Sequence, residues 1–350
     1  MKKTTSVIIL GIFVASIFIA INTASASRVD VYAGKNTLDN GNNLINTILS
    51  AKNGDIIRVH AGTYSITKNI TISSENIKII GDDPFKTIID ASGNSGNLIT
   101  TTKNNITIKN FTIKNSAKDA LSLGSDSTVS NCIITDNKGY AIYGDLNITI
   151  DYCYIENNGL DGIKINRNGK VNNVISINNI GNNIRAGEYS TIKNCLTTGS
   201  KTNDGISVDN RSSIINCTSS KNYGNGIKFK GKGEIINCIT TDNKISGING
   251  SSEVSVTYTN SWNNKNNYLK VTQGKGCISK DPKFTSGNYS WNNWINGKKV
   301  DYFLSKDSPS INSGSITSET LELLNGWSTT IDGVCDSKVV DMGFHFASKC

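Results

Sequence analysis

Residues 192–238 read IKNCLTTGSKTNDGISVDNRSSIINCTSSKNYGNGIKFKGKGEIINC, and one short pattern occurs three times in this stretch. The tetrapeptides IKNC, IINC and IINC begin at Ile192, Ile214 and Ile235, which are 22 and 21 residues apart. The spacing extends in both directions as a column of branched apolar residues: Ile108, Val129, Ile150, Val171, Ile192, Ile214, Ile235 and Val256. A repeat this short is typical of a solenoid, in which each unit must stack on its neighbours to bury its apolar face.

Two further columns keep the same register. The second lies three residues after the first and comprises Phe111, Cys132, Cys153, Val174, Cys195, Cys217, Cys238 and Thr259. The third comprises Leu121, Ile142, Ile163, Ile184, Ile206, Ile227 and Ile248. Apolar and polar residues alternate around the third column, as in Ile163-Lys164-Ile165, which is the period-two pattern of a β-strand.

The length of the repeat selects the type of solenoid. At about 3.3 Å per extended residue, one repeat gives roughly 70 Å of chain, enough for a turn with three short strands and three corners. A helical repeat would show a 3.6-residue period, and a leucine-rich repeat would need a leucine framework that is absent here. We therefore predict an all-β, single-stranded parallel β-helix solenoid with about 21 residues per coil.

The composition excludes several other classes of protein. The chain has 350 residues, of which 37% are hydrophobic and 18% are charged. The apolar fraction is too low for a multi-pass membrane protein, and the charge is too low for an ordinary charge-rich disordered chain. Two histidines leave little room for a histidine-based metal or catalytic cluster, and nothing resembles a nucleic-acid-binding module.

The first 26 residues have the pattern of a signal peptide. Lys2 and Lys3 precede an apolar run over residues 7–21, and the small residues Ala24-Ser25-Ala26 follow as a cleavage site. An uncleaved membrane anchor is the alternative. No later apolar run reaches the length of a membrane span. We expect an exported chain that is extracellular, at the cell surface or periplasmic, with a modest positive charge that favours acidic partners.

The mature chain divides into three expected segments. Residues 27–55 form an N-terminal cap, residues 56–265 form the coils, and residues 266–350 form a C-terminal cap with long loops. Caps are needed because an open stack of strands exposes an unpaired edge at each end. A short helix in the N-terminal cap is predicted to bury one apolar face: Leu44, Ile45, Ile48 and Leu49.

Two columns of asparagine accompany the apolar columns. The first stands one position before the cysteine column: Asn110, Asn131, Asn173, Asn194, Asn216 and Asn237. The second stands five positions after it: Asn137, Asn158, Asn179, Asn222, Asn243 and Asn264. Asparagine tolerates the left-handed backbone that corners need, and stacked amides bond to one another, so we interpret both columns as corner ladders.

Five of the eight cysteines lie in an apolar column: Cys132, Cys153, Cys195, Cys217 and Cys238. Stacked Cβ atoms about 4.8 Å apart exceed the roughly 3.8 Å that a disulfide prefers. We therefore expect buried free thiols at these positions, with a ladder for a soft metal as the remote alternative. The other cysteines are Cys277, Cys335 and Cys350, and Cys335–Cys350 is the candidate disulfide.

Three groups of motifs point to a known type of β-helix. One is the opening strand GDIIRVHAGTY at residues 54–64. Another is the turn at Asp161-Gly162-Ile163, Asp204-Gly205-Ile206 and Asn225-Gly226-Ile227. The last is a closing segment made of residues 281–284, 301–304, 308–311 and 340–346. Together they resemble the right-handed parallel β-helix proteins of the pectin-lyase-like superfamily over almost all of the mature chain, which implies a right-handed coil.

That superfamily includes pectate lyases, polygalacturonases, pectin esterases, tailspikes and adhesins, so the function has to come from the site. Polygalacturonase-like hydrolases need Asn-Thr-Asp, Asp-Asp, His-Gly and Arg-Ile-Lys motifs. Residues 202–205, Thr-Asn-Asp-Gly, are only loosely similar to the first of these. The Arg-x-Pro-x-x-Arg pattern of pectate lyases is also absent from the sequence. No complete catalytic set of these families is present, and whether the protein is an enzyme stays open.

Some lyases of this fold use a lysine base beside a calcium ion bound by several carboxylates. Here Asp161 and Asp204 stand two positions before the third apolar column, two coils apart. With Glu188 and Asp209 they are the candidate calcium ligands, and Lys164 or Lys228 would be the base. The alternative interpretation is that both aspartates form Asx corners before glycine.

Residues one position after the third column should face outward: Ser122, Tyr143, Lys164, Arg185, Ser207, Lys228 and Asn249. We predict that Tyr143, Lys164, Arg185 and Lys228 bind uronate or sulfate groups along an acidic polysaccharide. Arginine forks onto carboxylates, lysine offers a point charge, and tyrosine can stack on a sugar ring. The alternative is a solvated basic face without a ligand.

The sequence thus favours an exported β-helix protein that binds an acidic polysaccharide. A calcium-dependent polysaccharide lyase of the pectate type is the first alternative, and a structural adhesin or envelope protein is the second.

Overall fold

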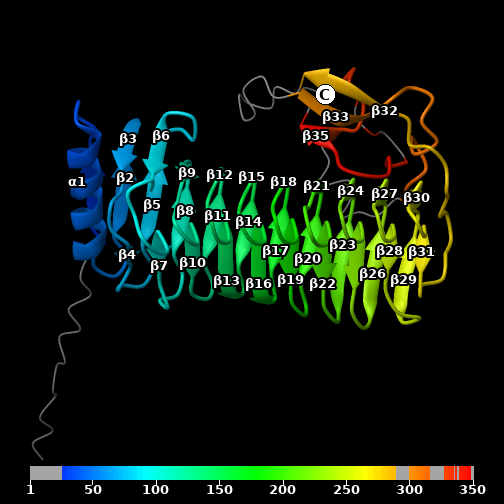
Figure 1. Ribbon diagram of the computed structural model, residues 1–350, viewed down its shortest axis with the longest axis horizontal. Coiled ribbons are helices and arrows are strands. Elements are labelled where there is room, and N and C mark those ends of the chain that lie inside the picture. The colour runs from blue at the N-terminus through cyan, green and yellow to red at the C-terminus, as the bar shows by residue number, and fades with distance from the viewer. Residues whose placement is uncertain (1–25, 289–298, 316–326, 335, 337–338, 348–350) are drawn as a thin grey trace, which may run out of the picture.

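The computed structural model describes residues 26–288, 299–315, 327–334, 336 and 339–347. Its main body is a parallel β-solenoid of about 10 turns, with helix α1 (Thr37–Ser50) at one end (Figure 1). The predicted all-β parallel β-helix is confirmed. No helix in the described ranges is long and apolar enough to span a membrane. The predicted signal peptide, residues 1–26, lies outside the described residues apart from Ala26.

Three long parallel sheets form the solenoid. Sheet A contains β1 (Arg28–Val31), β2 (Ile56–Val59), β5 (Lys78–Gly81), β8 (Thr107–Lys109), β11 (Thr128–Ser130), β14 (Thr149–Asp151), β17 (Lys170–Asn172), β20 (Thr191–Lys193), β23 (Ser212–Ile215), β26 (Gly233–Ile236) and β29 (Val254–Thr257). Sheet B contains β3 (Gly62–Ser65), β6 (Thr87–Asp90), β9 (Thr112–Lys114), β12 (Ile133–Thr135), β15 (Tyr154–Glu156), β18 (Ile175–Ile177), β21 (Leu196–Thr198), β24 (Thr218–Ser220), β27 (Ile239–Thr241) and β30 (Asn260–Trp262). Sheet C contains β4 (Ile70–Thr71), β7 (Ile99–Thr100), β10 (Leu121–Leu123), β13 (Ile142–Leu146), β16 (Ile163–Arg167), β19 (Ile184–Ala186), β22 (Ile206–Val208), β25 (Ile227–Phe229), β28 (Ile248–Asn249) and β31 (Tyr268–Leu269).

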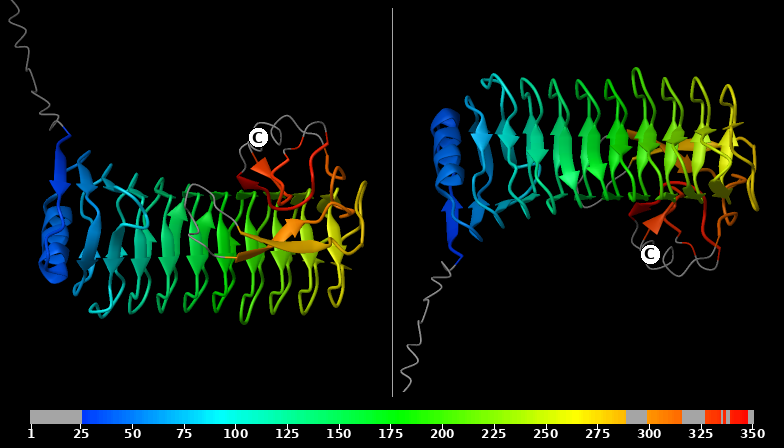
Figure 2. Two further views of the ribbon diagram at one scale, coloured as in Figure 1. Left: turned by 90° about the horizontal axis from the view of Figure 1, so that it is seen from above. Right: turned by 90° about the horizontal axis from the view of Figure 1, so that it is seen from below.

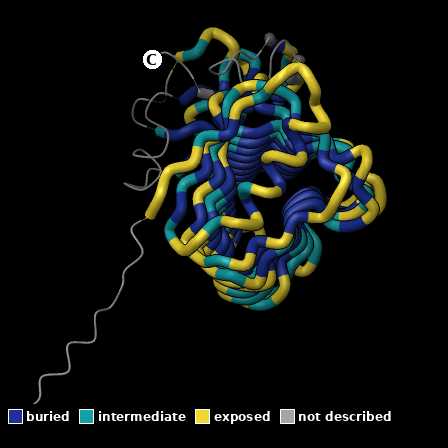
Figure 3. The backbone as a smooth tube through the Cα atoms, turned by 90° about the vertical axis from the view of Figure 1, so that its left-hand side faces the viewer, coloured by how far each residue is buried: buried dark blue, intermediate teal, exposed yellow. Residues whose placement is uncertain are grey.

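Neighbouring strands pair in the register that the columns predict. Ile163 pairs with Ile184, and Ile184 pairs with Ile206 across the longer repeat. The extra residue of that repeat lies in the corner between β21 and β22, so it does not shift the strands. The members of the third column are fully buried, and in the view along the axis the buried segments of successive coils lie behind one another (Figure 3). One continuous apolar core therefore fills the solenoid.

The two asparagine columns differ in what they do. Residues of the first column, such as Asn110 and Asn194, have φ of 66° and 46°, so they supply the left-handed corner between sheets A and B. The second column keeps ordinary backbone angles and forms a buried amide ladder. Asn137 Nδ2 donates to Asn158 Oδ1 at 3.0 Å, and Asn158 Nδ2 donates to Asn179 Oδ1 at 2.9 Å. These bonds satisfy polar groups that burial would otherwise leave unpaired.

The five column cysteines are buried free thiols, as predicted. Each thiol donates to the backbone carbonyl two residues earlier, at 3.2 to 3.4 Å. Burial raises the pKa of the thiols of Cys153, Cys217 and Cys238 well above its ordinary value. The candidate disulfide Cys335–Cys350 lies outside the described residues.

The inward face of sheet B is apolar in the early coils and polar in the later ones, and its outward face changes in the opposite sense. This change was not predicted. The inward residues of β12 and β15 are Ile134 and Ile155. From β18 onward the inward residues carry hydroxyl groups: Ser176, Thr197, Ser219, Thr240 and Ser261. Thr197 Oγ1 donates to Ser219 Oγ at 2.8 Å, so the hydroxyls form an interior ladder of their own.

The glycines of the Asp/Asn-Gly-Ile turns give this ladder room. A Cβ at Gly205 would lie 2.1 Å from Ser219 Oγ and 2.5 Å from Asn222 Nδ2. The backbone at Gly205 does not have a positive φ, so space rather than conformation requires glycine there. The turn into sheet C thus packs directly on the hydroxyl and amide ladders.

Helix α1 covers the first coil with Leu44, Ile45 and Ile48, which are buried as predicted. The prediction for Leu49 is wrong, because this side chain is 49% exposed. A helix turns about 100° per residue, which carries Leu49 away from the face that ends with Ile48. Strand β1 precedes the helix in the same segment and pairs with β2, so the N-terminal region also adds a rung to sheet A.

The C-terminal region closes the last coil and then folds back along the solenoid. Tyr268, Val271 and Cys277 pack against the end of the core. The chain continues through the antiparallel pairs β32 (Phe284–Asn288) with β33 (Lys299–Leu304) and β34 (Trp327–Ser328) with β35 (Phe346–Ala347). These lie over the later strands of sheet B (Figures 1 and 2). The segment predicted as a cap therefore also covers a flank.

Apolar outward side chains of sheet B hold this returning segment. Ile175 and Leu196 form one buried cluster with aromatic side chains of the C-terminal region: Tyr302, Phe303, Trp327, Phe344 and Phe346. A reciprocal pair of hydrogen bonds adds to the packing. The backbone N–H of His345 donates to Asn194 Oδ1 at 2.7 Å, and Asn194 Nδ2 donates to the His345 carbonyl at 3.0 Å.

Buried carboxylates lie beneath the same contact. Asp341 Oδ1 accepts the backbone N–H of Asn312 at 2.6 Å, and its Oδ2 accepts the hydroxyl of Thr329. Burial and the neighbouring Asp336 charge raise the pKa of Asp341 above its ordinary value. His345, which is fully buried, bonds to Asp336 through Nε2 at 2.8 Å.

We expect Gly205→Ala to destabilise the solenoid by about 1–3 kcal/mol or more, because the added methyl group overlaps Ser219 Oγ. The measurement is the urea midpoint, followed by circular dichroism. Gly34→Ala is the matched control, since its Cβ would meet only Asn40 Oδ1 at 3.6 Å. Equal midpoints for the two variants would contradict the space requirement.

The raised pKa of Asp341 predicts a specific pH dependence. Because the folded protein binds this proton more tightly than the unfolded chain, wild-type stability gains from protonation as pH falls from above the raised pKa toward 3.8. Asp341→Asn lacks that gain. The free energy of unfolding of the variant minus that of the wild type should therefore decrease as the pH is lowered from neutral toward 3.8, the ordinary pKa of an aspartate. A difference that stays constant or increases on acidification would contradict this assignment.

Candidate functional site

The outward row of sheet C forms in the predicted order. Strand pairing places each residue beside its neighbour on the next coil: Ser122, Tyr143, Lys164, Arg185, Ser207, Lys228 and Asn249. The inward neighbours in these strands are buried apolar residues such as Ile163 and Ile165. Parallel strands lie about 4.8 Å apart, so the row is a ladder at that spacing.

Lys164 is held over two aromatic rings. Its Nζ lies 5.2 Å from the ring centroids of both Tyr140 and Tyr143. The two rings are 5.8 Å apart and tilted by 35°, and Tyr143 Oη accepts Asn166 Nδ2 at 3.0 Å. Tyr140 was not among the predicted residues. The sequence could have indicated it, because Tyr140 lies three residues before Tyr143, just before the start of β13.

Arg185 and Lys228 have different surroundings. Arg185 is exposed, and it has no ion-pair partner within the described ranges. Lys228 Nζ lies 4.0 Å from Asp204 Oδ2, with the lysine side chain 42% exposed. Asp204 is largely buried, but the Lys228 side chain is partly exposed and the two groups are at the limit of an ion pair, so both cations remain able to meet a ligand.

A second aromatic position lies further along the same face. The Tyr189 ring is flanked by Arg167, whose Cζ is 4.9 Å from its centroid, and by Arg211 at 5.5 Å. Arg167 also pairs with Glu188 at 3.8 Å. This cluster was not predicted. The repeat spacing aligns Tyr189 with Arg211, whereas Arg167 aligns with Glu188, so the spacing could have indicated only the Tyr189–Arg211 pair. We call the outward side of β13, β16, β19, β22 and β25, with these flanking residues, the sheet C face.

The four candidate calcium ligands each bond to partners of their own and not to a shared site. Asp161 Oδ1 accepts the backbone and side-chain N–H groups of Asn182 at 2.6 and 3.0 Å. Asp204 Oδ1 accepts the same two groups of Asn225, the next coil's counterpart, at 2.8 and 2.6 Å. These bonds are those expected if both aspartates form Asx corners before glycine, which was the alternative interpretation.

The other two candidates pair with cations. Glu188 lies near Arg167, and Asp209 Oδ1 lies 3.4 Å from Lys230 Nζ. In the part of the chain that the structure describes, no three His, Cys, Asp or Glu side chains gather where they could hold a metal ion. Calcium binding here stays a prediction, and it would need these carboxylates to rearrange.

No family model and no curated protein sequence matches this chain. Solved structures do match. The crystal structure of pectate lyase Pel9A has a TM-score of 0.55 at 16% identity, covering 91% of this chain and 95% of that one. The mannuronan C-5 epimerase AlgE4 A-module of Azotobacter vinelandii gives 0.45 at 12% identity, over 65% and 91%. Pectin methylesterase from carrot gives 0.36 at 15% identity, over 74% and 89%.

The likeness to Pel9A extends over nearly the whole of both chains. At this identity it establishes the fold alone, a parallel β-helix. The fold that the resemblance of the sequence motifs implied is therefore confirmed.

The two sides of β16 give a direct test of orientation. We expect Lys164→Ala to change the free energy of unfolding by less than about 1 kcal/mol, since exposed cation–π contacts are weak. Ile163→Ala, one residue away but inward, should cost about 2–5 kcal/mol through the cavity it leaves. Chemical denaturation of both variants is the measurement. A larger loss at Lys164 than at Ile163 would mean that the strand faces are assigned incorrectly.

Proposed function

We propose that this protein is exported and binds an acidic polysaccharide along the sheet C face. The observation that carries the proposal is the row of Lys164, Arg185 and Lys228 on one side of sheet C. Lys164 and Arg185 lie on adjacent coils, and Lys228 lies two coils beyond Arg185, with the buried Ser207 between them. A polysaccharide with a carboxylate or sulfate on successive sugars presents anions along a line. Arg185, with a free guanidinium, can bind one such group in a bidentate manner.

The aromatic side chains suit the same ligand. Tyr143 and Tyr189 are partly exposed and lie beside cations, so a sugar ring could stack on each while its acidic group meets Lys164 or Arg211. A tyrosine between positive charges offers apolar area and hydrogen-bonding capacity together. That combination favours a bound ligand over a merely solvated basic surface.

The charge balance of the face favours anions. Its outward residues and their neighbours toward sheet A carry more cations than carboxylates: Lys164, Arg167, Arg185, Arg211, Lys228, Lys230 and Lys232 against Asp145, Glu188 and Asp209. A surface of one dominant sign attracts and orients a polyelectrolyte of the other sign. The carboxylates that are present can accept sugar hydroxyl groups.

Two further observations support the proposal. The pattern of residues 1–26 is that of an export signal. Pel9A, which shares the fold over 91% of this chain, is a pectate lyase and so acts on an acidic polysaccharide. The fold by itself does not determine the ligand, and the sheet C face is what points to an acidic glycan.

The decisive variant is Lys164→Ala/Arg185→Ala/Lys228→Ala. We expect its affinity for an acidic glycan such as polygalacturonate to fall about tenfold or more at low salt, because three charge-assisted contacts are lost. The difference from wild type should shrink as salt screens both proteins. Affinity electrophoresis through gels with and without the glycan measures this.

The control removes three cations from another face. Lys78→Ala/Lys109→Ala/Lys170→Ala changes the net charge equally on exposed positions of sheet A and should retain binding. If both triple variants bind as the wild type does, the sheet C face is not the site. If the wild type binds no acidic glycan, the structural alternative replaces the proposal. Release of an unsaturated, ultraviolet-absorbing product in the presence of calcium would assign the lyase alternative instead.

A further inference from the structure

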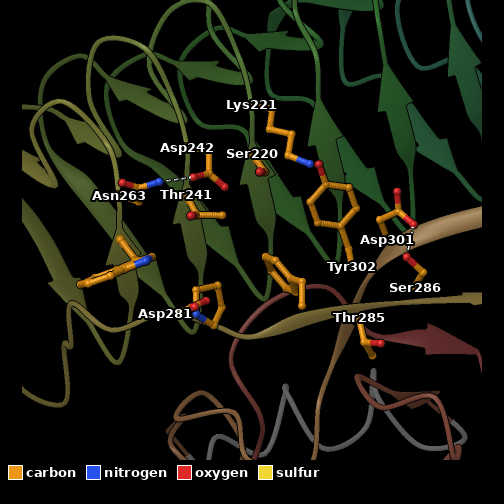
Figure 4. A pocket seen from close by; sticks show the side chains of 13 residues that line it. Ser220, Lys221, Thr241, Asp242, Asn263, Asp281, Thr285, Ser286, Asp301 and Tyr302 are labelled. Atoms are coloured by element: carbon orange, nitrogen blue, oxygen red, sulfur yellow. Dashed lines mark hydrogen bonds between the residues drawn. The ribbon is translucent and has the colours of Figure 1, made fainter.

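A groove of about 440 Å³ lies between the solenoid and the returning C-terminal segment, away from the sheet C face. Its floor is the end of three successive strands of sheet B and the corners that follow them: Ser220, Lys221, Thr241, Asp242, Trp262 and Asn263. Its wall comes from β32, β33 and the chain before them: Asp281, Pro282, Phe284, Thr285, Ser286, Asp301 and Tyr302. Figure 4 shows Asp242 and Lys221 facing the same space as Tyr302 and Asp281. The volume is that of a small-ligand site.

The polar groups of the groove are fixed by neighbours. Asp242 Oδ1 accepts Asn263 Nδ2 at 2.6 Å, while its other oxygen accepts no hydrogen bond from the described residues. Tyr302 Oη shares a hydrogen bond of 2.7 Å with Thr198 Oγ1. Lys221 Nζ lies 5.9 Å from the Tyr302 ring centroid. The groove therefore holds an oriented carboxylate oxygen and an aromatic wall without needing a ligand to arrange them.

Trp262 gives the groove its second chemical feature. It is an outward residue of β30, and its side chain is 38% exposed. Its counterparts on the two preceding coils, Thr241 and Ser220, are small, so the indole projects further from the sheet than they do. An exposed indole next to hydrogen-bond acceptors is an arrangement that suits the apolar face and the hydroxyl edge of a sugar ring.

The charge of the groove disfavours an acidic sugar. Three carboxylates, those of Asp242, Asp281 and Asp301, line it together with one cation, Lys221. A uronate or sulfate would meet like charges, which costs free energy at short range. An uncharged sugar with adjacent hydroxyl groups can instead donate to these carboxylate oxygens.

We propose that this groove is a second carbohydrate site, specific for an uncharged sugar residue that stacks on Trp262 and donates hydroxyl hydrogen bonds to Asp242. It rests on different residues from the sheet C face, and it stands or falls independently of the acidic-glycan proposal. A protein with both sites would bind a heteropolysaccharide, or two different glycans, with acidic sugars at the sheet C face and uncharged sugars in the groove.

The test is isothermal titration calorimetry with neutral hexasaccharides of glucose, mannose, galactose and xylose, compared with hexagalacturonate and glucosamine hexamer. We expect at least one neutral hexasaccharide to bind, with affinity reduced about tenfold or more by Trp262→Ala through lost stacking. Asp242→Asn should also weaken binding, since it replaces the carboxylate while keeping the side chain's size.

Two controls separate the sites and the fold. Tyr223→Ala removes an aromatic side chain that is 50% exposed on a neighbouring corner outside the groove, and it should leave binding unchanged. The sheet C triple variant should also bind the neutral sugar normally. The proposal is overturned if no neutral hexasaccharide binds, if neither groove variant weakens binding, or if hexagalacturonate or the glucosamine hexamer binds this groove more tightly.

Discussion

The register between coils is the constraint on which the rest of this structure depends. Backbone N–H groups of the strands donate to a neighbouring coil, to the carbonyl of the residue just before the pairing partner, for example Ile163 to Asn183 and Ile184 to Gly205. Once that register is set, every side chain has a counterpart of the same orientation at about 4.8 Å on either side. Interior isoleucines then share one core, asparagines share one amide ladder, and cysteines stack without meeting a disulfide's geometry. The same constraint forces exposed cations together, and the tyrosines beside Lys164 and between Arg167 and Arg211 reduce the repulsion that results.

Sheet B shows how the register can be kept while the chemistry of a wall is reversed. Inward isoleucines give way to Ser176 and its successors, and the hydrogen-bonded interior this creates replaces part of the apolar filling. The apolar area moves to the outside of the same strands, where Leu196 and Ile175 bind the C-terminal aromatics. The groove with Trp262 exists because the returning segment lies over this wall and leaves the corner of three coils uncovered.

The repeat in the sequence was sufficient to predict the solenoid, its strand register, the buried thiols and the outward row with Lys164 and Arg185. These features depend on neighbours at one fixed separation along the chain, so spacing alone identifies them. Tyr189 and Arg211 had the same signal and were overlooked, whereas Arg167 stands one position off that column. The path of the described residues after Cys277 could not be predicted, because it depends on contacts between parts of the chain with no common period. The only trace in the sequence is local: Ser176 stands between Ile175 and Ile177, which reverses the usual alternation of the strand.

The bond between Asn194 and His345 joins residues 151 positions apart. Coils can form one after another as the chain emerges, since each needs only its neighbour. The apolar outer wall of sheet B has no such local partner, and it stays open to solvent until the aromatic residues from Tyr302 to Phe346 that cover it have been made. A nascent or truncated chain would therefore present a row of well-formed coils with an uncovered apolar flank, which is the type of surface that chaperones bind and that promotes aggregation. The flank is therefore covered when the returning aromatic residues dock, and not when the solenoid is complete.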